Sequence, residues 1–128
     1  MSRRPFLESI YFAWAGLRWA WQTQGNMRRH IAVAIAVLIL ARICAFSPEK
    51  QVLILLTVTL VITAELMNTA VEALIDVCVP RYHPLAKRAK DVAAAAVLVT
   101  AIAAGAVGFF LFGSYLLQFL SAGNLFLP

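Results

Sequence analysis

Three carboxylates and one amide recur at regular spacing inside a long apolar stretch of this 128-residue chain. They are separated by three, four and four residues, so on an α-helix all of them share one face: Glu65, Asn68, Glu72 and Asp76. A carboxylate at membrane depth is costly, and such residues usually serve a function. A face of this kind can hold a cation and accept a proton. The spacing therefore predicts a polar site on one helix.

The composition predicts a membrane protein. Hydrophobic residues make up 62% of the chain, charged residues 13%, and the mean hydropathy is +0.84. So many apolar side chains exceed what the core of one small domain can bury, so lipid must cover much of the surface. We expect a single domain over residues 1–128.

The basic residues indicate the orientation of the chain. Nine of the eleven fall into three groups, which are Arg3, Arg4 and Arg18, then Arg28 and Arg29, then Arg81, Lys87, Arg88 and Lys90. The positive-inside rule places these groups, with the N-terminus, in the cytoplasm. Membrane topology explains the net charge of +5 better than nucleic-acid binding does.

The apolar periodicity predicts an all-α fold with four helices. An amphipathic helix over about residues 5–22 carries aromatic rings that suit the membrane interface. Apolar segments predict transmembrane helices over about residues 29–47, 51–79 and 86–120. Turn-forming residues at 22–26 interrupt the first two elements. Since three spans cannot surround so polar a face alone, we expect an oligomer.

Position along the helix separates the carboxylates. Counted from Gln51 at about 1.5 Å per residue, Glu65 lies roughly 21 Å from the outer end and Glu72 roughly 32 Å, against a hydrocarbon core of about 30 Å. Desolvation in the inner leaflet favours protonation of Glu65, which suits it to accept a proton from a lipid hydroxyl. Glu72 and Asp76 are expected at the cytoplasmic headgroups, facing the basic start of the last helix.

Two interpretations of this acidic and basic surface remain open. The charges could simply neutralise each other at a helix hairpin. Alternatively, the carboxylates hold a divalent metal while Lys90 and nearby arginines hold phosphates, which is most of what phosphoryl transfer needs. His83 could contact a nucleotide or cap the loop. No Walker motif or kinase catalytic loop is present in the sequence.

Together these residues resemble the prokaryotic diacylglycerol kinase and undecaprenol kinase family of small membrane lipid kinases. The resemblance runs from about Phe12 to Gly108, and its core is the segment from Glu65 to Asp76, then His83, then Ala89-Lys90-Asp91. It implies a homotrimer of three-span subunits with a surface helix, located in the bacterial inner membrane with the active site on the cytoplasmic side. It also implies transfer of the ATP γ-phosphate to a lipid hydroxyl with Mg²⁺ bound.

The resemblance also implies roles for individual residues. Glu65 would be the proton acceptor, supported by Asn68 and Lys90, and Glu72 would be a metal ligand. The residues expected around ATP are Phe12, Asp76, Tyr82, His83, Lys90 and Asp91. Those expected at the lipid are Trp14, Arg18, Trp21, Arg28, Glu65 and Ala94.

One position departs from the family pattern. Many members carry a second metal-binding glutamate where this chain has Gln24. Glutamine offers one neutral carbonyl oxygen and is a weaker Mg²⁺ ligand, so Gln24 is kept as a weak candidate.

The segments Asn26–His30 and His83–Lys87 look more like the undecaprenol kinase branch than the diacylglycerol kinase branch. We therefore expect undecaprenol as the lipid, with diacylglycerol as the alternative. A small proton-coupled transporter is a more remote alternative, since an intramembrane glutamate can serve as its coupling site. A non-catalytic membrane subunit is a further alternative, but it would give no function to Glu65 and Glu72.

Overall fold

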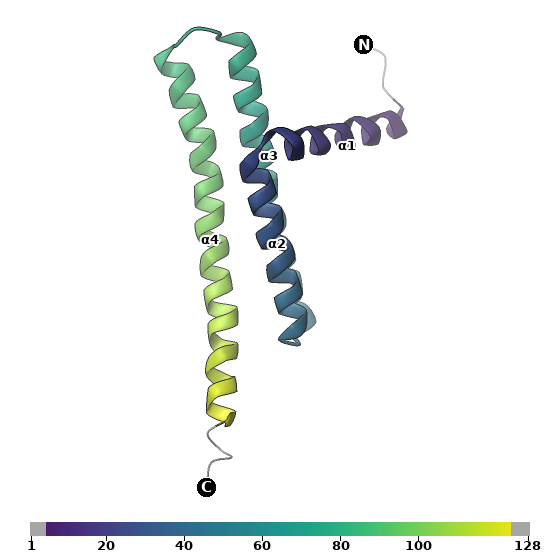
Figure 1. The fold of residues 1–128 in the computed structure, drawn as a ribbon, viewed down its shortest axis with the longest axis vertical. Coiled ribbons are helices and arrows are strands. Elements are labelled where there is room, and N and C mark those ends of the chain that lie inside the picture. The colour runs from purple at the N-terminus through teal and green to yellow at the C-terminus, as the bar shows by residue number, and fades with distance from the viewer. Residues whose placement is uncertain (1–4, 124–128) are drawn as a thin grey trace.

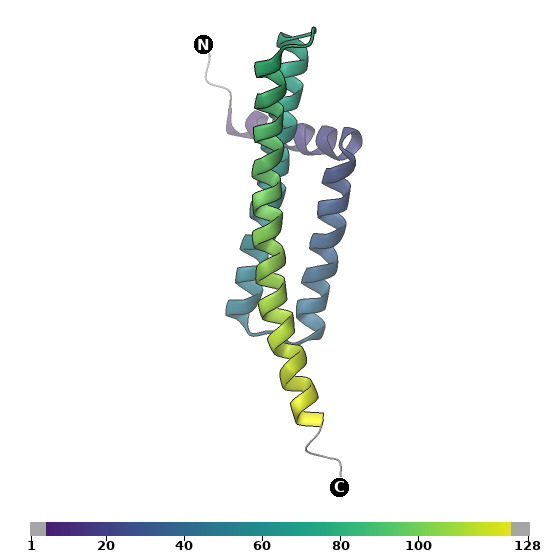
Figure 2. The ribbon, with the colours of Figure 1, turned by 90° about the vertical axis from the view of Figure 1, so that its left-hand side faces the viewer.

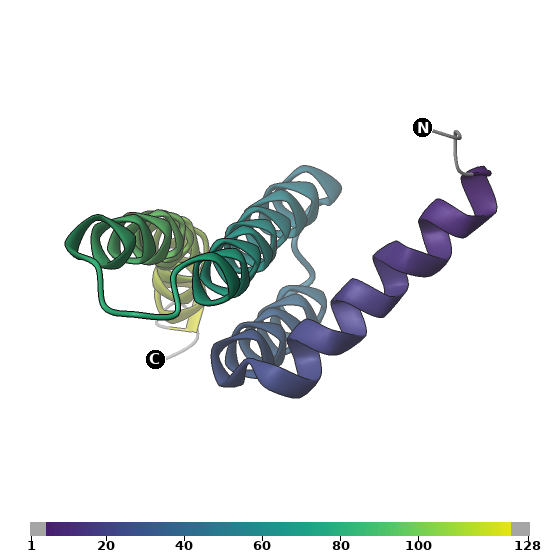
Figure 3. The same ribbon diagram turned by 90° about the horizontal axis from the view of Figure 1, so that it is seen from above.

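The computed structural model describes residues 5–123, and all regular secondary structure in this part of the chain is α-helix. Its elements are α1 (Phe6–Thr23), α2 (Gly25–Ile43), α3 (Pro48–Cys78) and α4 (Pro84–Gly123). Helices α2, α3 and α4 run side by side, while α1 projects away from them (Figure 1). The view from above shows the same separation of α1 from the bundle (Figure 3). The expected all-α class is confirmed. Arg3 and Arg4, two of the basic residues used to predict the orientation, lie outside the described residues.

Gln24 is the single non-helical residue between α1 and α2, with φ −104° and ψ 112°. We expected the break to extend over residues 22–26 and the next helix to start near residue 29. The break is shorter because Arg28 stabilises the end of α1 from the first turn of α2. Its Nη1 donates hydrogen bonds to the carbonyl oxygens of Trp21 and Gln22, both at 3.3 Å. The carbonyl groups in the last turn of a helix have no partner within that helix, and Arg28 supplies one here. Helix α1 can therefore continue to Thr23, and α2 can begin at Gly25.

A tight turn joins α2 to α3 and ends α2 at Ile43, before the expected residue 47. Ala45 adopts a left-handed conformation with φ 49°, which reverses the chain. Gln51 then donates a hydrogen bond from Nε2 to the carbonyl of Phe46, at 2.6 Å. The Phe46 ring is buried against Phe112 of α4, with ring centroids 4.9 Å apart. This packing fixes the α2–α3 turn against α4.

Prolines at the first turns of α3 and α4 let both helices begin before the expected residues 51 and 86. Proline is well tolerated there because the N–H it lacks would be unpaired in any case. At its far end α4 continues to Gly123, and Figure 2 shows it extending past the α2–α3 turn. Helix α3 lies between α2 and α4 and packs against both.

Two of the helices are long and apolar enough to cross a membrane. They are Pro48–Cys78, with mean hydropathy 1.9, and Pro84–Ser121, with mean hydropathy 2.4. Both are mostly exposed, unlike the core helices of a soluble protein. Helix α2 does not meet the same criterion, because its 19 residues include Arg28, Arg29 and Arg42. The described residues thus contain two candidate membrane spans, and the span expected over residues 29–47 stays a prediction.

Candidate active site

The four aligned polar residues of α3 differ in burial. Glu65 is 2% exposed and Asn68 is 8% exposed, whereas Glu72 is half-buried and Asp76 is exposed. Asn68 Nδ2 donates a hydrogen bond to Glu72 Oε1 at 3.1 Å, joining two successive turns of the helix. The face thus runs from an enclosed carboxylate to one open to solvent.

Several polar groups at the enclosed end have no hydrogen-bond partner. Within residues 5–123 nothing donates a hydrogen bond to the Glu65 carboxylate, and its electrostatic neighbours are His30 and Glu72. The buried atoms Asn68 Oδ1 and Thr69 Oγ1 are also unpaired in this part of the chain. Each such group costs about 1–3 kcal/mol, and buried polar groups in native proteins normally find a partner. The enclosed end of the face is therefore suited to receive a polar ligand group.

Two residues of this region were missed in the sequence. Thr69 could have been found, because it lies one turn from Glu65 on the same face. His30 comes from α2, where it is half-buried and close enough to Glu65 for an electrostatic interaction. A titratable residue at the start of an apolar segment was the only signal for it in the sequence.

A second cluster lies where α3 and α4 meet. Lys90 of α4 forms an ion pair with Asp76 of α3. Both belong to the lining of a pocket of about 280 Å³, together with Arg81, Tyr82, His83 and Lys87. The structure thus brings together four of the residues expected around ATP, namely Asp76, Tyr82, His83 and Lys90.

The remaining expected nucleotide residues lie outside that lining. Asp91 accepts a hydrogen bond from Lys87 at 2.7 Å, between side chains that are both more than half exposed. Phe12 lies on α1, and its ring contacts Tyr11 with centroids 5.5 Å apart. Phe12 does not line the pocket.

His83 was expected either to contact a nucleotide or to cap the loop, and the structure shows a capping contact. Its Nδ1 accepts a hydrogen bond from the backbone N–H of Leu85, at 3.2 Å, in the first turn of α4. The ring therefore caps the helix, and its Nε2 stays available for a ligand in the pocket.

The acidic face offers oxygen ligands, which suit Mg²⁺. Among residues 5–123 no three His, Cys, Asp or Glu side chains gather into a metal-holding group. Mg²⁺ commonly binds through one or two carboxylates and completes its coordination with water and substrate phosphates. Glu72 fits that pattern, with Asn68 holding one of its oxygens. Gln24 is half-buried at the α1–α2 junction and its backbone N–H donates to Ala20 O at 2.9 Å.

The residues expected at the lipid are spread over all four helices. Trp14, Arg18 and Trp21 are exposed on α1, and Ala94 is exposed on α4. The Arg28 guanidinium is engaged by the carbonyls at the end of α1. Of this set, only Glu65 is enclosed within the chain.

Comparison with known proteins decides the family. The model of the prokaryotic diacylglycerol kinase family matches residues 11–112. The chain belongs to this family of lipid kinases. Its match with a diacylglycerol kinase of Synechocystis sp. is 45% identical over 103 residues, covering 80% of this chain and 59% of that relative. An undecaprenol kinase of Bacillus subtilis is 36% identical over 107 residues, covering 84% of this chain and 87% of the relative. A diacylglycerol kinase of Escherichia coli is 34% identical over 98 residues, or 77% and 80% of the two chains.

Membership in this family favours the phosphoryl-transfer interpretation of the charged surface. The Lys90–Asp76 ion pair alone would equally satisfy a neutralised hairpin. A neutralised hairpin does not explain why the Glu65 carboxylate is enclosed within the chain.

Proposed function

We propose that this chain transfers the γ-phosphate of ATP to the hydroxyl of a membrane lipid. The observation that carries the proposal is the enclosed Glu65 carboxylate, which shares one helix face with Asn68 and Glu72. One turn further, Asp76 joins that face to the pocket that holds Lys90. A proton acceptor and a phosphate-binding region thus follow each other along α3.

Glu65 accepts the proton of the lipid hydroxyl in the proposed reaction. The hydroxyl oxygen forms a bond to the γ-phosphorus, and the bond between that phosphorus and the β–γ bridging oxygen breaks. The products are a phosphorylated lipid and ADP. A general base contributes about 10²- to 10⁴-fold to such a step.

Lys90 and the neighbouring pocket residues hold the phosphates in this proposal. Bound Mg²⁺ would neutralise charge on the β- and γ-phosphates, with Glu72 as its protein ligand and Gln24 as a weaker candidate. Asn68 holds the Glu72 carboxylate in place through its hydrogen bond. Positioning and charge stabilisation are the main requirements for phosphoryl transfer, and these side chains supply both.

The proposed arrangement in the membrane has three spans, with α2 as the third beside α3 and α4. In this arrangement the N-terminus and the α3–α4 loop lie in the cytoplasm, which the basic residues of both segments favour. Helix α1, with its exposed Trp14, Trp19 and Trp21, would then lie in the cytoplasmic interface. A homotrimer would bring residues of a second subunit to the exposed side of the acidic face.

Undecaprenol is the lipid we propose, because of the segments Asn26–His30 and His83–Lys87 and the similarity to the undecaprenol kinase of Bacillus subtilis. Diacylglycerol is the second candidate, favoured by the higher identity to the Synechocystis protein. Both lipids present a primary hydroxyl at headgroup depth, so the same acidic face serves either.

The test is a direct assay with purified protein, [γ-³²P]ATP and Mg²⁺, in separate reactions with undecaprenol and diacylglycerol. Label should appear in a lipid product, and the ratio of kcat/KM values identifies the preferred lipid. A folded protein that labels neither lipid would disprove the proposed function. The Glu65→Gln variant is the matched negative control.

A further inference from the structure

Two basic residues lie at the turn between α2 and α3, apart from the three groups of basic residues described above. Arg42 is in the last turn of α2, and Lys50 is in the first turn of α3. Counted along α3 at about 1.5 Å per residue, Lys50 is roughly 33 Å from Glu72, close to the thickness of a hydrocarbon core. In the proposed membrane arrangement both cations therefore lie at the outer headgroups, where basic residues are normally few.

The two cations are held around one aromatic residue of the turn. Lys50 Nζ lies 5.3 Å from the centroid of the Phe46 ring, which is a cation–π contact. Arg42 Nη1 donates a hydrogen bond to Gln51 Oε1 at 3.1 Å, and Gln51 Nε2 donates to the Phe46 carbonyl. The structure thus places both positive charges at the same turn.

Neither cation has an anionic partner in the part of the chain that the structure describes. The ion pairs within residues 5–123 lie at the α3–α4 end of the molecule. Glu49, the carboxylate of the α2–α3 turn, is exposed and pairs with neither cation. Helix α4 packs on the turn and carries no charge from Val92 to Ser121. The turn is therefore a cationic surface that can receive an anion.

An exposed apolar stripe on α2 leads to Arg42. Ile35, Ile39 and Arg42 follow each other at intervals of four and three residues, so they share one face of the helix. Both isoleucines are more than half exposed. A phospholipid matches this order, because its acyl chain can lie along the isoleucines while its phosphate reaches the arginine. A soluble anion would use only the charged end of the stripe.

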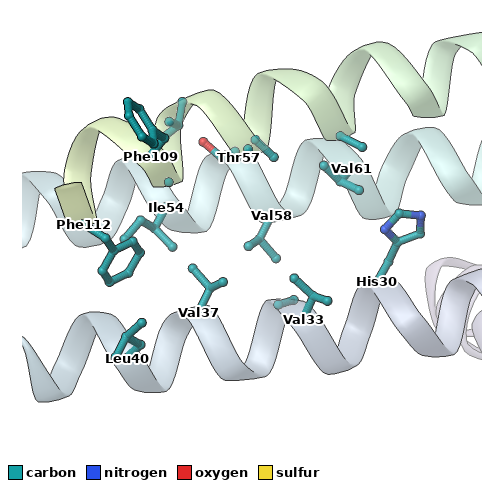
Figure 4. A pocket seen from close by; sticks show the side chains of 16 residues that line it. His30, Val33, Val37, Leu40, Ile54, Thr57, Val58, Val61, Phe109 and Phe112 are labelled. Carbon is teal, nitrogen blue, oxygen red and sulfur yellow. The ribbon is translucent and has the colours of Figure 1, made fainter.

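The same turn connects α2 to α4. The Phe46 ring packs against Phe112 and Tyr115 of α4. Next to this packing, an apolar cavity of about 470 Å³ lies between α2, α3 and α4, and Figure 4 shows Leu40, Ile54 and Phe112 toward one end of it. Because the cavity leaves space between the helices unfilled, the contacts at the turn matter more for holding them together. A ligand that fixes the turn should therefore stabilise the fold.

We propose that the α2–α3 turn binds an anionic phospholipid of the outer leaflet. Arg42 and Lys50 donate hydrogen bonds to its phosphate oxygens, and one acyl chain lies along Ile35 and Ile39. This lipid is a stabilising ligand, separate from the lipid alcohol that is phosphorylated on the cytoplasmic side. The inference uses the proposed membrane arrangement and does not depend on the kinase reaction.

The test titrates the full-length protein in dodecyl maltoside micelles with phosphatidylglycerol, and native mass spectrometry gives the Kd of the tightest site. The wild type should bind phosphatidylglycerol more tightly than the zwitterionic phosphatidylcholine. Lys50→Gln should raise the Kd for phosphatidylglycerol by about 5-fold, and Arg42→Gln combined with Lys50→Gln by about 25-fold. Lys50→Arg keeps the charge and should bind like the wild type.

Thermal unfolding provides a second measurement. Phosphatidylglycerol should raise the Tm of the wild type, because a ligand that binds only the folded state stabilises it. The same lipid concentration should raise the Tm of Lys50→Gln by less. If the double variant does not fold, Lys50→Gln and Lys50→Arg decide the question.

Two controls separate this site from general attraction between charges. Arg88→Gln removes an exposed basic residue at the start of α4 and should leave the Kd of the tightest site unchanged. sn-Glycerol 1-phosphate carries a phosphate without acyl chains, and it should not bind at the concentrations at which phosphatidylglycerol does.

Three results would each overturn the inference. They are equal affinity for phosphatidylglycerol and phosphatidylcholine, an equal loss of affinity in Arg88→Gln and Lys50→Gln, and equally tight binding of sn-glycerol 1-phosphate. The last result would show a simple anion site in place of a lipid site. Because these measurements contain no ATP, their failure leaves the proposed kinase function standing, and a protein without kinase activity can still bind the lipid.

Discussion

Lys90 of α4 is held by an ion pair to Asp76 of α3, across the loop that joins the two helices. The Lys90 side chain is 34% exposed, which is less than the 67% of its partner. The pair sets the position of a cation at the wall of the pocket proposed for the nucleotide. In the proposed reaction, Asp76 would therefore act on phosphate binding through Lys90.

The variant Asp76→Asn should raise the KM for ATP by about 2- to 5-fold. The expected change is modest because an ion pair this exposed is worth at most about 1 kcal/mol. The lipid KM should stay the same. Glu49→Gln, at the opposite end of α3, is a control for loss of a carboxylate outside the site. An unchanged ATP KM in Asp76→Asn would mean that Lys90 does not need this partner.

The variant Glu65→Gln should lower kcat by at least about 100-fold, since it removes the proposed proton acceptor. ATP binding, measured by isothermal titration, should remain close to that of the wild type. The variant should be at least as stable as the wild type, because it removes an enclosed carboxylate that lacks a hydrogen bond. A variant with normal turnover would require a different base.

The variant Glu72→Gln should weaken Mg²⁺-dependent binding of ATP. The neutral amide is a poorer Mg²⁺ ligand than a carboxylate, and its NH₂ group could also repel the metal. The measurement is a Mg²⁺ titration of ATP affinity, expected to shift by about tenfold or more to higher Mg²⁺. The same shift in Glu65→Gln would show that Glu65 also affects Mg²⁺ binding, contrary to the proposed separation of proton acceptor and metal ligand.

The variant Gln24→Glu should lower the Mg²⁺ concentration needed for half-maximal activity, because it adds a carboxylate at the position where the family resemblance leads us to expect a second metal ligand. Gln22→Glu adds the same charge two residues away, on an exposed part of α1. If both variants change the Mg²⁺ dependence equally, the effect is general electrostatics and Gln24 has no ligand position.

The variant Phe46→Ala should destabilise the fold by about 3–5 kcal/mol without changing either KM of the remaining folded protein. Phe46 is 5% exposed and packs between Phe112 and Tyr115, far along the chain from the acidic face. Denaturation in detergent, followed by circular dichroism, measures the loss. Normal stability would show that the α2–α3 turn does not depend on this ring.

Features that follow from the spacing of residue types were predictable from the sequence, and those that depend on particular side-chain or packing contacts were not. The helical face of Glu65, Asn68 and Glu72 follows from spacing alone. The single-residue break at Gln24 was not predictable, because it depends on Arg28 reaching back to the carbonyls of α1.

The site shows the same division. The pairing of Asp76 with Lys90 follows from a short loop between an acidic and a basic helix end. The approach of His30 to Glu65 brings together residues 35 positions apart in the sequence, and it depends on how α2 packs against α3. No local pattern specifies that packing.

The apolar part of α4 is longer than the hydrocarbon core of a bilayer, so we expect the position of this helix to depend on membrane thickness. No charged residue occurs from Val92 to Ser121, a stretch that is roughly 45 Å long as a helix, compared with about 30 Å of hydrocarbon. Such a mismatch is relieved by tilting the helix or by thickening the surrounding bilayer. Because Lys90 stands at one end of this helix, a change of tilt would move the cation relative to Asp76. We therefore expect lipid acyl-chain length to affect the phosphate pocket from a distance.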